Sequence, residues 1–78
     1  MLTYALINEN GNELQYEYFP EGGTASGVVS YNKETGKCYI NKLSEQDKHQ
    51  MYALKLFKKM RDFERNGSFQ IEGMIAWY

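Results

Sequence analysis

The chain contains one cysteine and one histidine, and these two residues are its first candidates for catalysis. A cysteine nucleophile needs a general base within hydrogen-bond distance, so Cys38 and His49 could act together if the fold brought them into contact. Cys38 alternates with Ile40 on a predicted strand, where a free cysteine commonly serves as a small core residue. His49 falls on the apolar face of a predicted helix, which favours a packed imidazole ring. We therefore predict that the chain is not an enzyme and keep the Cys38–His49 pair as an alternative.

The sequence predicts neither a metal site nor a phosphate-binding loop. Metal sites need clusters of His, Cys or carboxylate ligands, and one His with one Cys does not make such a cluster. Residues 22–27 have the glycine spacing of a phosphate loop, but Val28 and Val29 follow where that loop requires Lys and Ser or Thr. The segment also leads into a strand rather than a helix. We expect no cofactor and no bound metal.

Positive charge is concentrated in residues 48–65, which carry six basic and two acidic side chains and therefore a net charge of +4. The whole chain has a net charge of −1, so the remaining residues carry −5. A basic helical face can bind phosphate groups, although it is also typical of an ordinary solvated surface. The candidate anion-binding or nucleic-acid-binding face comprises Lys48, Lys55, Lys58, Lys59 and Arg65.

Aromatic and apolar side chains indicate a second kind of surface. The chain has seven tyrosines, and five of them fall on the four strands predicted within residues 2–41. Tyrosines on an open sheet face can anchor a protein partner or stack on nucleic-acid bases, whereas inward-facing tyrosines would fill the core. Two further apolar residues fall near the polar side of the predicted helix. The candidate partner-binding residues are Tyr31, Tyr39, Met51, Leu54, Trp77 and Tyr78.

Alternating apolar and polar residues predict four consecutive strands. Asn10-Gly11 is a strong hairpin signal and joins a strand over residues 2–8 to one over residues 13–19. Further strands are expected over residues 25–32 and 38–41, joined by a turn that ends on a left-handed glycine.

A helix is predicted over residues 45–65. Ser44 precedes it as a cap, with Asp47 at its third position, and a wide apolar stripe follows with helical spacing. Residues 69–78 alternate again, as expected for a fifth strand or for two short extended pieces broken at Gly73.

These elements predict one globular domain over residues 1–78, of the α+β class. It is an antiparallel four-stranded meander plus one amphipathic helix and a C-terminal strand, in the order β-β-β-β-α-β. The helix stripe should cover one sheet face. The expected core comprises Leu6, Leu14, Tyr16, Tyr18, Val29, Ile40, Tyr52, Ala53, Leu56, Phe57, Met60, Phe63, Phe69 and Ile71.

Several classes of protein do not fit the sequence. A single cysteine cannot form an internal disulfide, which excludes a disulfide-stabilised secreted domain. The first residues lack the features of a signal peptide, and no apolar run approaches the roughly 20 residues that a membrane helix needs. We therefore expect a cytoplasmic protein without a membrane partner. The runs at residues 18–22, 27–36 and 73–78 resemble short uncharacterised proteins from Gram-positive bacteria, a resemblance that implies a bacterial origin but no activity.

The leading functional hypothesis is a small non-enzymatic protein-interaction module. Its partner would be another protein or a second copy of the chain in a homodimer. One alternative is weak binding of single-stranded nucleic acid through the basic helix face and the sheet tyrosines. The other is an enzyme that uses Cys38 and His49.

Overall fold

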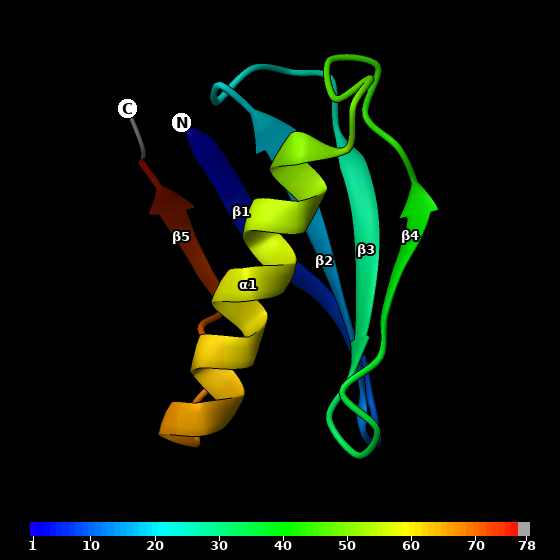
Figure 1. The fold of residues 1–78 in the computed structure, drawn as a ribbon, viewed down its shortest axis with the longest axis vertical. Helices are drawn as coiled ribbons and strands as arrows, with labels where there is room; N and C mark the ends of the chain where they lie inside the picture. Colours follow the sequence, from blue (N-terminus) through cyan, green and yellow to red (C-terminus); the bar gives the residue numbers. More distant parts are fainter. Residues whose placement is uncertain (77–78) are drawn as a thin grey trace.

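Five antiparallel strands form one sheet, and a single helix lies against one of its faces (Figure 1). The structure is a computed structural model and describes residues 1–76. The predicted α+β class and the order β-β-β-β-α-β are confirmed. The elements are β1 (Leu2–Asn10), β2 (Glu13–Pro20), β3 (Gly27–Asn32), β4 (Cys38–Lys42), α1 (Met51–Asn66) and β5 (Glu72–Ile75).

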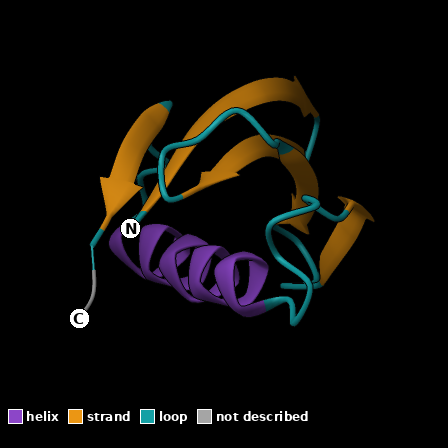
Figure 2. Cartoon of the chain, turned by 90° about the horizontal axis from the view of Figure 1, so that it is seen from above, coloured by secondary structure: helices purple, strands orange, loops and turns teal. Residues whose placement is uncertain are grey.

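The strands lie in the order β4-β3-β2-β1-β5, so the last strand pairs with the first. The four-stranded meander follows from short turns between consecutive strands, whereas β5 reaches β1 only after the chain has crossed the sheet as α1. Seen from above, the sheet curves around the helix, which occupies its concave side (Figure 2). Within residues 1–76 no helix covers the convex outer face of the sheet, and β4 and β5 are its two edges.

Alternation along the strands separates the two faces of the sheet. The inward-facing residues pack against the apolar stripe of α1 and form one core, as expected for a sheet with one buried face. Most of the predicted core is confirmed, and the prediction missed three buried residues, Leu2, Tyr4 and Tyr31. The buried apolar residues are Leu2, Tyr4, Leu14, Tyr16, Tyr18, Val29, Tyr31, Ala53, Leu56, Phe57, Met60 and Phe63.

Ile71 was expected in the core, and that prediction is wrong, because its side chain is 70% exposed. Phe69 instead fills the space near the end of the helix. Its ring centroid lies 5.7 Å from that of Tyr31 and 5.9 Å from that of Phe63. Since β5 begins only at Glu72, Ile71 lies in the bend before the strand and points to solvent.

The helix begins later than the sequence predicts, at Met51 rather than near residue 45. Residues 44–50 form two consecutive turns instead. The N–H of Asp47 donates to the carbonyl of Ser44, and the N–H of Gln50 donates to the carbonyl of Asp47, both over 3.0 Å. Gln50 then adopts a left-handed conformation with φ of 60° immediately before the helix.

Asp47 explains this difference. Its carboxylate oxygens accept hydrogen bonds from the N–H groups of Tyr52 and Ala53, each at 3.0 Å. These are the second and third N–H groups of the helix, which a capping side chain usually satisfies. Because Asp47 caps α1 from outside the helix, it cannot also be its third residue, and the predicted cap at Ser44 is wrong.

Candidate functional site

Four inward-facing tyrosines of the sheet are buried, and their hydroxyl groups bond to segments around α1. All four are at most 3% exposed. Their phenol rings fill the core, while each hydroxyl donates a hydrogen bond near the rim of the interior. The pairs are Tyr4 with Gln70 Oε1 (2.8 Å), Tyr16 with Gln70 O (2.6 Å), Tyr18 with Asp47 Oδ2 (3.0 Å) and Tyr31 with Glu64 Oε2.

Burial changes the acid–base behaviour of these hydroxyls. Desolvation raises the pKa of Tyr16 to about 12, with smaller contributions from Tyr4 and Glu9. Desolvation is also the main cause that raises the pKa values of Tyr18 and Tyr31 to about 12. All three groups therefore remain protonated hydrogen-bond donors at neutral pH.

Alkaline pH should therefore destabilise the fold steeply. The pKa of a tyrosine in the unfolded chain is about 10. In the folded chain the pKa values of Tyr16, Tyr18 and Tyr31 are raised to about 12. Between these values the native state binds more protons than the unfolded state, so stability present below pH 10 is lost as pH rises. Each group contributes a slope of about 1.4 kcal/mol per pH unit. Urea denaturation from pH 8 to 12 measures this slope.

The variant Tyr16→Phe tests whether the raised pKa of Tyr16 contributes to this loss of stability. It removes one ionisable group together with its hydrogen bond to Gln70 O. We expect the alkaline slope to become shallower by about 1.4 kcal/mol per pH unit, while stability at pH 7 falls by about 1 kcal/mol. An unchanged slope would show that Tyr16 does not hold its proton more tightly in the folded state.

A buried polar network joins the start of α1 to the sheet. Tyr18 donates to Asp47 and accepts a hydrogen bond from the N–H of Ser44 at 3.2 Å. The Ser44 hydroxyl donates to the carbonyl of Ala25 at 2.6 Å. Asp47 is only 2% exposed, so its carboxylate is not accessible to a ligand. The network holds the loop before the helix in place.

Cys38 and His49 do not meet. Cys38 is the first residue of β4 and lies at the end of the sheet where α1 ends. The charged groups that affect the pKa of its thiol belong to Arg61 and Glu64, in the last turns of α1. His49 is exposed in the turn before α1 rather than on the apolar helix face, so that prediction is wrong. Residues 51 and 61 of the helix are roughly 15 Å apart along its axis, at about 1.5 Å per residue. Desolvation also raises the pKa of the Cys38 thiol, as expected for a structural cysteine.

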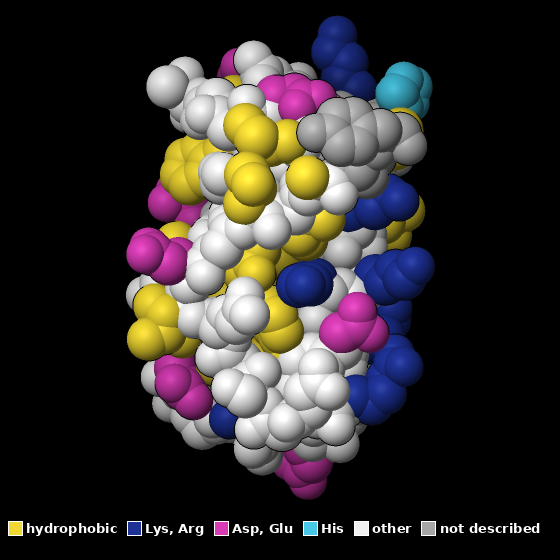
Figure 3. Space-filling view, turned by 90° about the vertical axis from the view of Figure 1, so that its left-hand side faces the viewer, with side chains coloured by type: hydrophobic (Ala, Val, Ile, Leu, Met, Phe, Trp, Pro, Cys, Tyr) yellow, Lys and Arg dark blue, Asp and Glu magenta, His cyan; other side chains and the backbone are white. Residues whose placement is uncertain are grey.

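Most of the predicted basic face lies on α1, but not all of it. Lys48 is exposed in the turn before the helix, because the helix begins later than expected. Lys59 is half-buried, with its ammonium 5.8 Å from the Phe63 ring centroid. Arg65 forms a salt bridge with Asp62 at 3.0 Å. From the side of β5, basic side chains are seen gathered over α1 (Figure 3).

The predicted partner-binding residues divide between surface and core. Met51 and Leu54 are 55% and 56% exposed on α1, and Tyr39 is 49% exposed on the outer side of β4. Tyr31 is buried and therefore does not belong to the surface. Residues 77 and 78, the predicted Trp77 and Tyr78 contacts, lie outside the described part of the chain.

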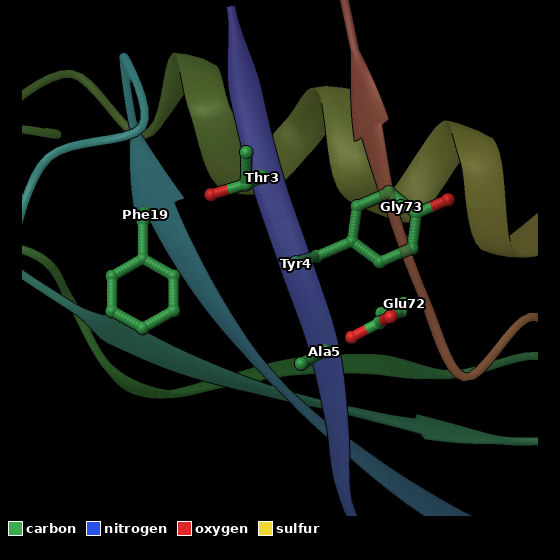
Figure 4. A pocket seen from close by; sticks show the side chains of 6 residues that line it. All are labelled: Thr3, Tyr4, Ala5, Phe19, Glu72 and Gly73. Atoms are coloured by element: carbon green, nitrogen blue, oxygen red, sulfur yellow. The ribbon is translucent and has the colours of Figure 1, made fainter.

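A shallow hollow lies on the outer face of the sheet beside β5 (Figure 4). Its volume is about 390 Å³, and its floor is the backbone of β1 with the small Ala5 side chain. Phe19 bounds it on one side and Glu72 on the other (Figure 4). The lining residues are Thr3, Tyr4, Ala5, Phe19, Glu72 and Gly73.

A second groove lies on the opposite side of β5, between this strand and α1. Its volume is about 210 Å³, and it is lined by Lys55, Lys58, Lys59, Asp62 and Ile75. In Figure 3 hydrophobic side chains are visible between the basic surface of the helix and the sheet. The outer hollow and this groove therefore flank the same edge strand, one on each face of the sheet.

The sequence reasoning did not single out Phe19, Glu72 or Met74. Strand alternation could have identified all three as residues of the outer sheet face. Because Tyr16 and Tyr18 face inward, Phe19 must face outward. Glu72 and Met74 alternate with the inward-facing residues of β5 in the same way, but their importance depends on where that strand lies in the sheet.

Comparisons of the chain with protein-family models, curated proteins and solved structures find no match. The resemblance to short bacterial proteins therefore stays a prediction. Within residues 1–76 there is no group of three or more His, Cys, Asp or Glu side chains that could hold a metal ion. Helix α1 is neither long nor apolar enough to cross a membrane.

Proposed function

We propose that this chain is a non-enzymatic interaction module that binds another protein at the free edge of β5. The observation that supports this proposal is an edge strand with unpaired backbone groups, flanked by a hollow on one face and a groove on the other. Extended segments of partner proteins bind such edges by adding a strand to the sheet.

The register identifies which backbone groups of β5 are free. The N–H of Leu6 donates to the carbonyl of Ile71 at 2.6 Å, and Tyr4 lies opposite Gly73. Directly opposed residues in an antiparallel pair alternate between bonded and non-bonded positions. The N–H and C=O groups of Glu72 and Met74 therefore point away from β1. Within residues 1–76 no strand pairs with this side of β5.

Exposed apolar side chains surround the same edge. Met74 is 58% exposed and Ile71 is 70% exposed. A single exposed apolar residue is normal, but two beside an unpaired strand edge favour a contact surface. Partner binding would remove this apolar area from water and satisfy the free backbone groups together.

The other edge of the sheet is less suited to strand addition. The register between β3 and β4 shifts between Val28 and Val29, so that Asn41 is the extra residue of a bulge in β4. Bulges and lysines on edge strands are features that discourage further pairing. β4 carries both, since Lys42 lies next to the bulge, whereas β5 pairs in regular register with β1.

The non-enzymatic part of the proposal rests on the separation of Cys38 from His49 and on the partial burial of the thiol. Nucleic-acid binding has less support than protein binding. It needs exposed tyrosines near the basic face, and four of the sheet tyrosines are buried. Tyr39 is exposed, but on the face of the sheet opposite to α1.

Site-specific photocross-linking tests this proposal. The variant Met74→p-benzoylphenylalanine places a photoreactive group at the β5 edge. Irradiation of cells of the source organism that express this variant should give a discrete covalent adduct. The matched control is Thr35→p-benzoylphenylalanine, because Thr35 is exposed in the turn between β3 and β4. Mass spectrometry identifies the captured protein. An adduct at twice the chain mass of 9.1 kDa would make the partner a second copy.

Two outcomes would contradict the proposal. One is the absence of any adduct at residue 74 when the chain is folded and expressed. The other is the same set of adducts from both positions, which would reflect random collision rather than a binding edge.

A further inference from the structure

We infer that the partner segment at the β5 edge is an extended peptide in which an acidic residue alternates with an apolar one. This inference rests on the proposed function and specifies the chemistry of its partner. It follows from the charges in the groove between β5 and α1 and from the alternation of side chains along any strand added there.

The groove carries a net positive charge. Lys55, Lys58 and Lys59 line it together with one acidic residue, Asp62. Asp62 already bonds to Arg65 at 3.0 Å, so its charge is partly compensated. Lys58 is exposed and Lys59 is half-buried against Phe63. The lysines therefore give the groove an excess of positive charge close to the free strand edge.

A strand added beside β5 would direct its side chains alternately to the two faces of the sheet. The inward-pointing side chains would extend toward the flank of α1, where Lys58 and Lys59 lie. Carboxylates at these positions would form charge-assisted hydrogen bonds with the lysines. A groove of about 210 Å³ has space for short acidic side chains of this kind.

The outward-pointing side chains would meet a different surface. They would lie next to Met74, whose side chain is 58% exposed on the outer face of β5. Cross-strand neighbours on one face of a sheet stabilise each other when both are apolar. Apolar residues at the outward positions would cover Met74 and approach the outer hollow beyond it.

Titration with a synthetic peptide tests the inference. The probe is an N-acetylated, C-amidated heptapeptide that alternates Glu and Val, added to the ¹⁵N-labelled full chain at low salt. We expect amide shifts centred on Glu72 and Met74, with weaker binding as salt is raised. A peptide that alternates Lys and Val should bind at least about tenfold more weakly because it repels the groove lysines. This comparison uses the unaltered chain and does not depend on the folding of any variant.

A charge-reversed variant provides the second comparison. Lys58→Glu combined with Lys59→Glu should lower the affinity of the chain for the acidic peptide by about tenfold. Its matched control, Lys37→Glu combined with Lys42→Glu, changes the net charge equally near β4 and should leave the affinity within about twofold. N-methylation of the peptide amide that would donate to the carbonyl of Glu72 should also weaken binding, because it removes that donor.

Three results would overturn the inference: equal binding of the acidic and basic peptides, shifts centred on β4, or no binding of the acidic peptide at millimolar concentration. The proposed function fails separately, through the cross-linking result at residue 74. If cross-links form there while the acidic peptide does not bind, the edge binds a partner of other chemistry.

Discussion

Asp47→Ala is expected to lower the free energy of unfolding by about 3 kcal/mol, which is a large fraction of the stability of a domain this small. The carboxylate accepts hydrogen bonds from Tyr18 and from the N–H groups of Tyr52 and Ala53. Without it, these three donors remain in a site where Asp47 is only 2% exposed, and each buried donor without a partner is costly. The melting temperature should fall by roughly 15 °C, as measured by circular dichroism.

Two further variants make this prediction specific. Asp62→Ala removes a partly exposed carboxylate whose ion pair with Arg65 lies on the surface, and it should change stability by less than about 0.5 kcal/mol. Asp47→Asn keeps one carbonyl acceptor, so its loss of stability should lie between those of the two alanine variants. If Asp47→Ala and Asp62→Ala lose the same stability, Asp47 does not cap α1.

Gly27→Ala should destabilise the fold by about 3 kcal/mol through overpacking. A Cβ atom at Gly27 would lie 2.3 Å from Cε1 of the Tyr18 ring, closer than any relaxed contact. The ring cannot swing aside easily, because its hydroxyl bonds to Asp47 and Ser44. Gly27 pairs in regular register with Tyr18 of β2, so no bulge gives the backbone room to move. Glycine is needed here because the tyrosine ring lies over the backbone of β3.

Gly23→Ala is the matched control for this substitution. Its nearest atoms would lie 3.4 Å from the new Cβ, which is an ordinary contact, and Gly23 does not have a positive φ. We expect a change of less than about 0.5 kcal/mol, measured by urea denaturation under the same conditions. Equal losses from the two variants would mean that Tyr18 is not packed against Gly27 in solution.

Both predictions concern Tyr18, which connects the sheet to the start of α1. Its ring covers Gly27, and its hydroxyl links Asp47 to Ser44. The proposed binding edge depends on a different set of contacts, since Gly73 of β5 is held beneath Tyr4. A Cβ atom at Gly73 would lie 2.5 Å from the Tyr4 hydroxyl. Variants of Gly27 and Asp47 therefore test the stability of the fold without altering residues at the β5 edge.

Local sequence signals were sufficient for the meander and for the existence of the helix. Strand alternation, the Asn10-Gly11 turn and the helical apolar stripe all act between residues a few positions apart, and their consequences are visible in any short window. The same signals located the groove lysines Lys58 and Lys59 on α1. They also predicted that Cys38 packs as a small core residue, and its side chain is partly buried against the core.

Other features depend on residues that are distant in the chain. Asp47 caps the helix while accepting a bond from Tyr18, 29 residues away, so a local capping pattern placed the helix start wrongly. Tyr16 bonds to the backbone of Gln70 across 54 residues, and that contact helps to bring the last strand beside the first. Only this pairing makes β5 an edge and leaves Glu72 and Met74 with unpaired backbone groups. The amino-acid pattern defines which face of a strand is apolar, but the neighbours of that strand follow from the packing of the whole domain.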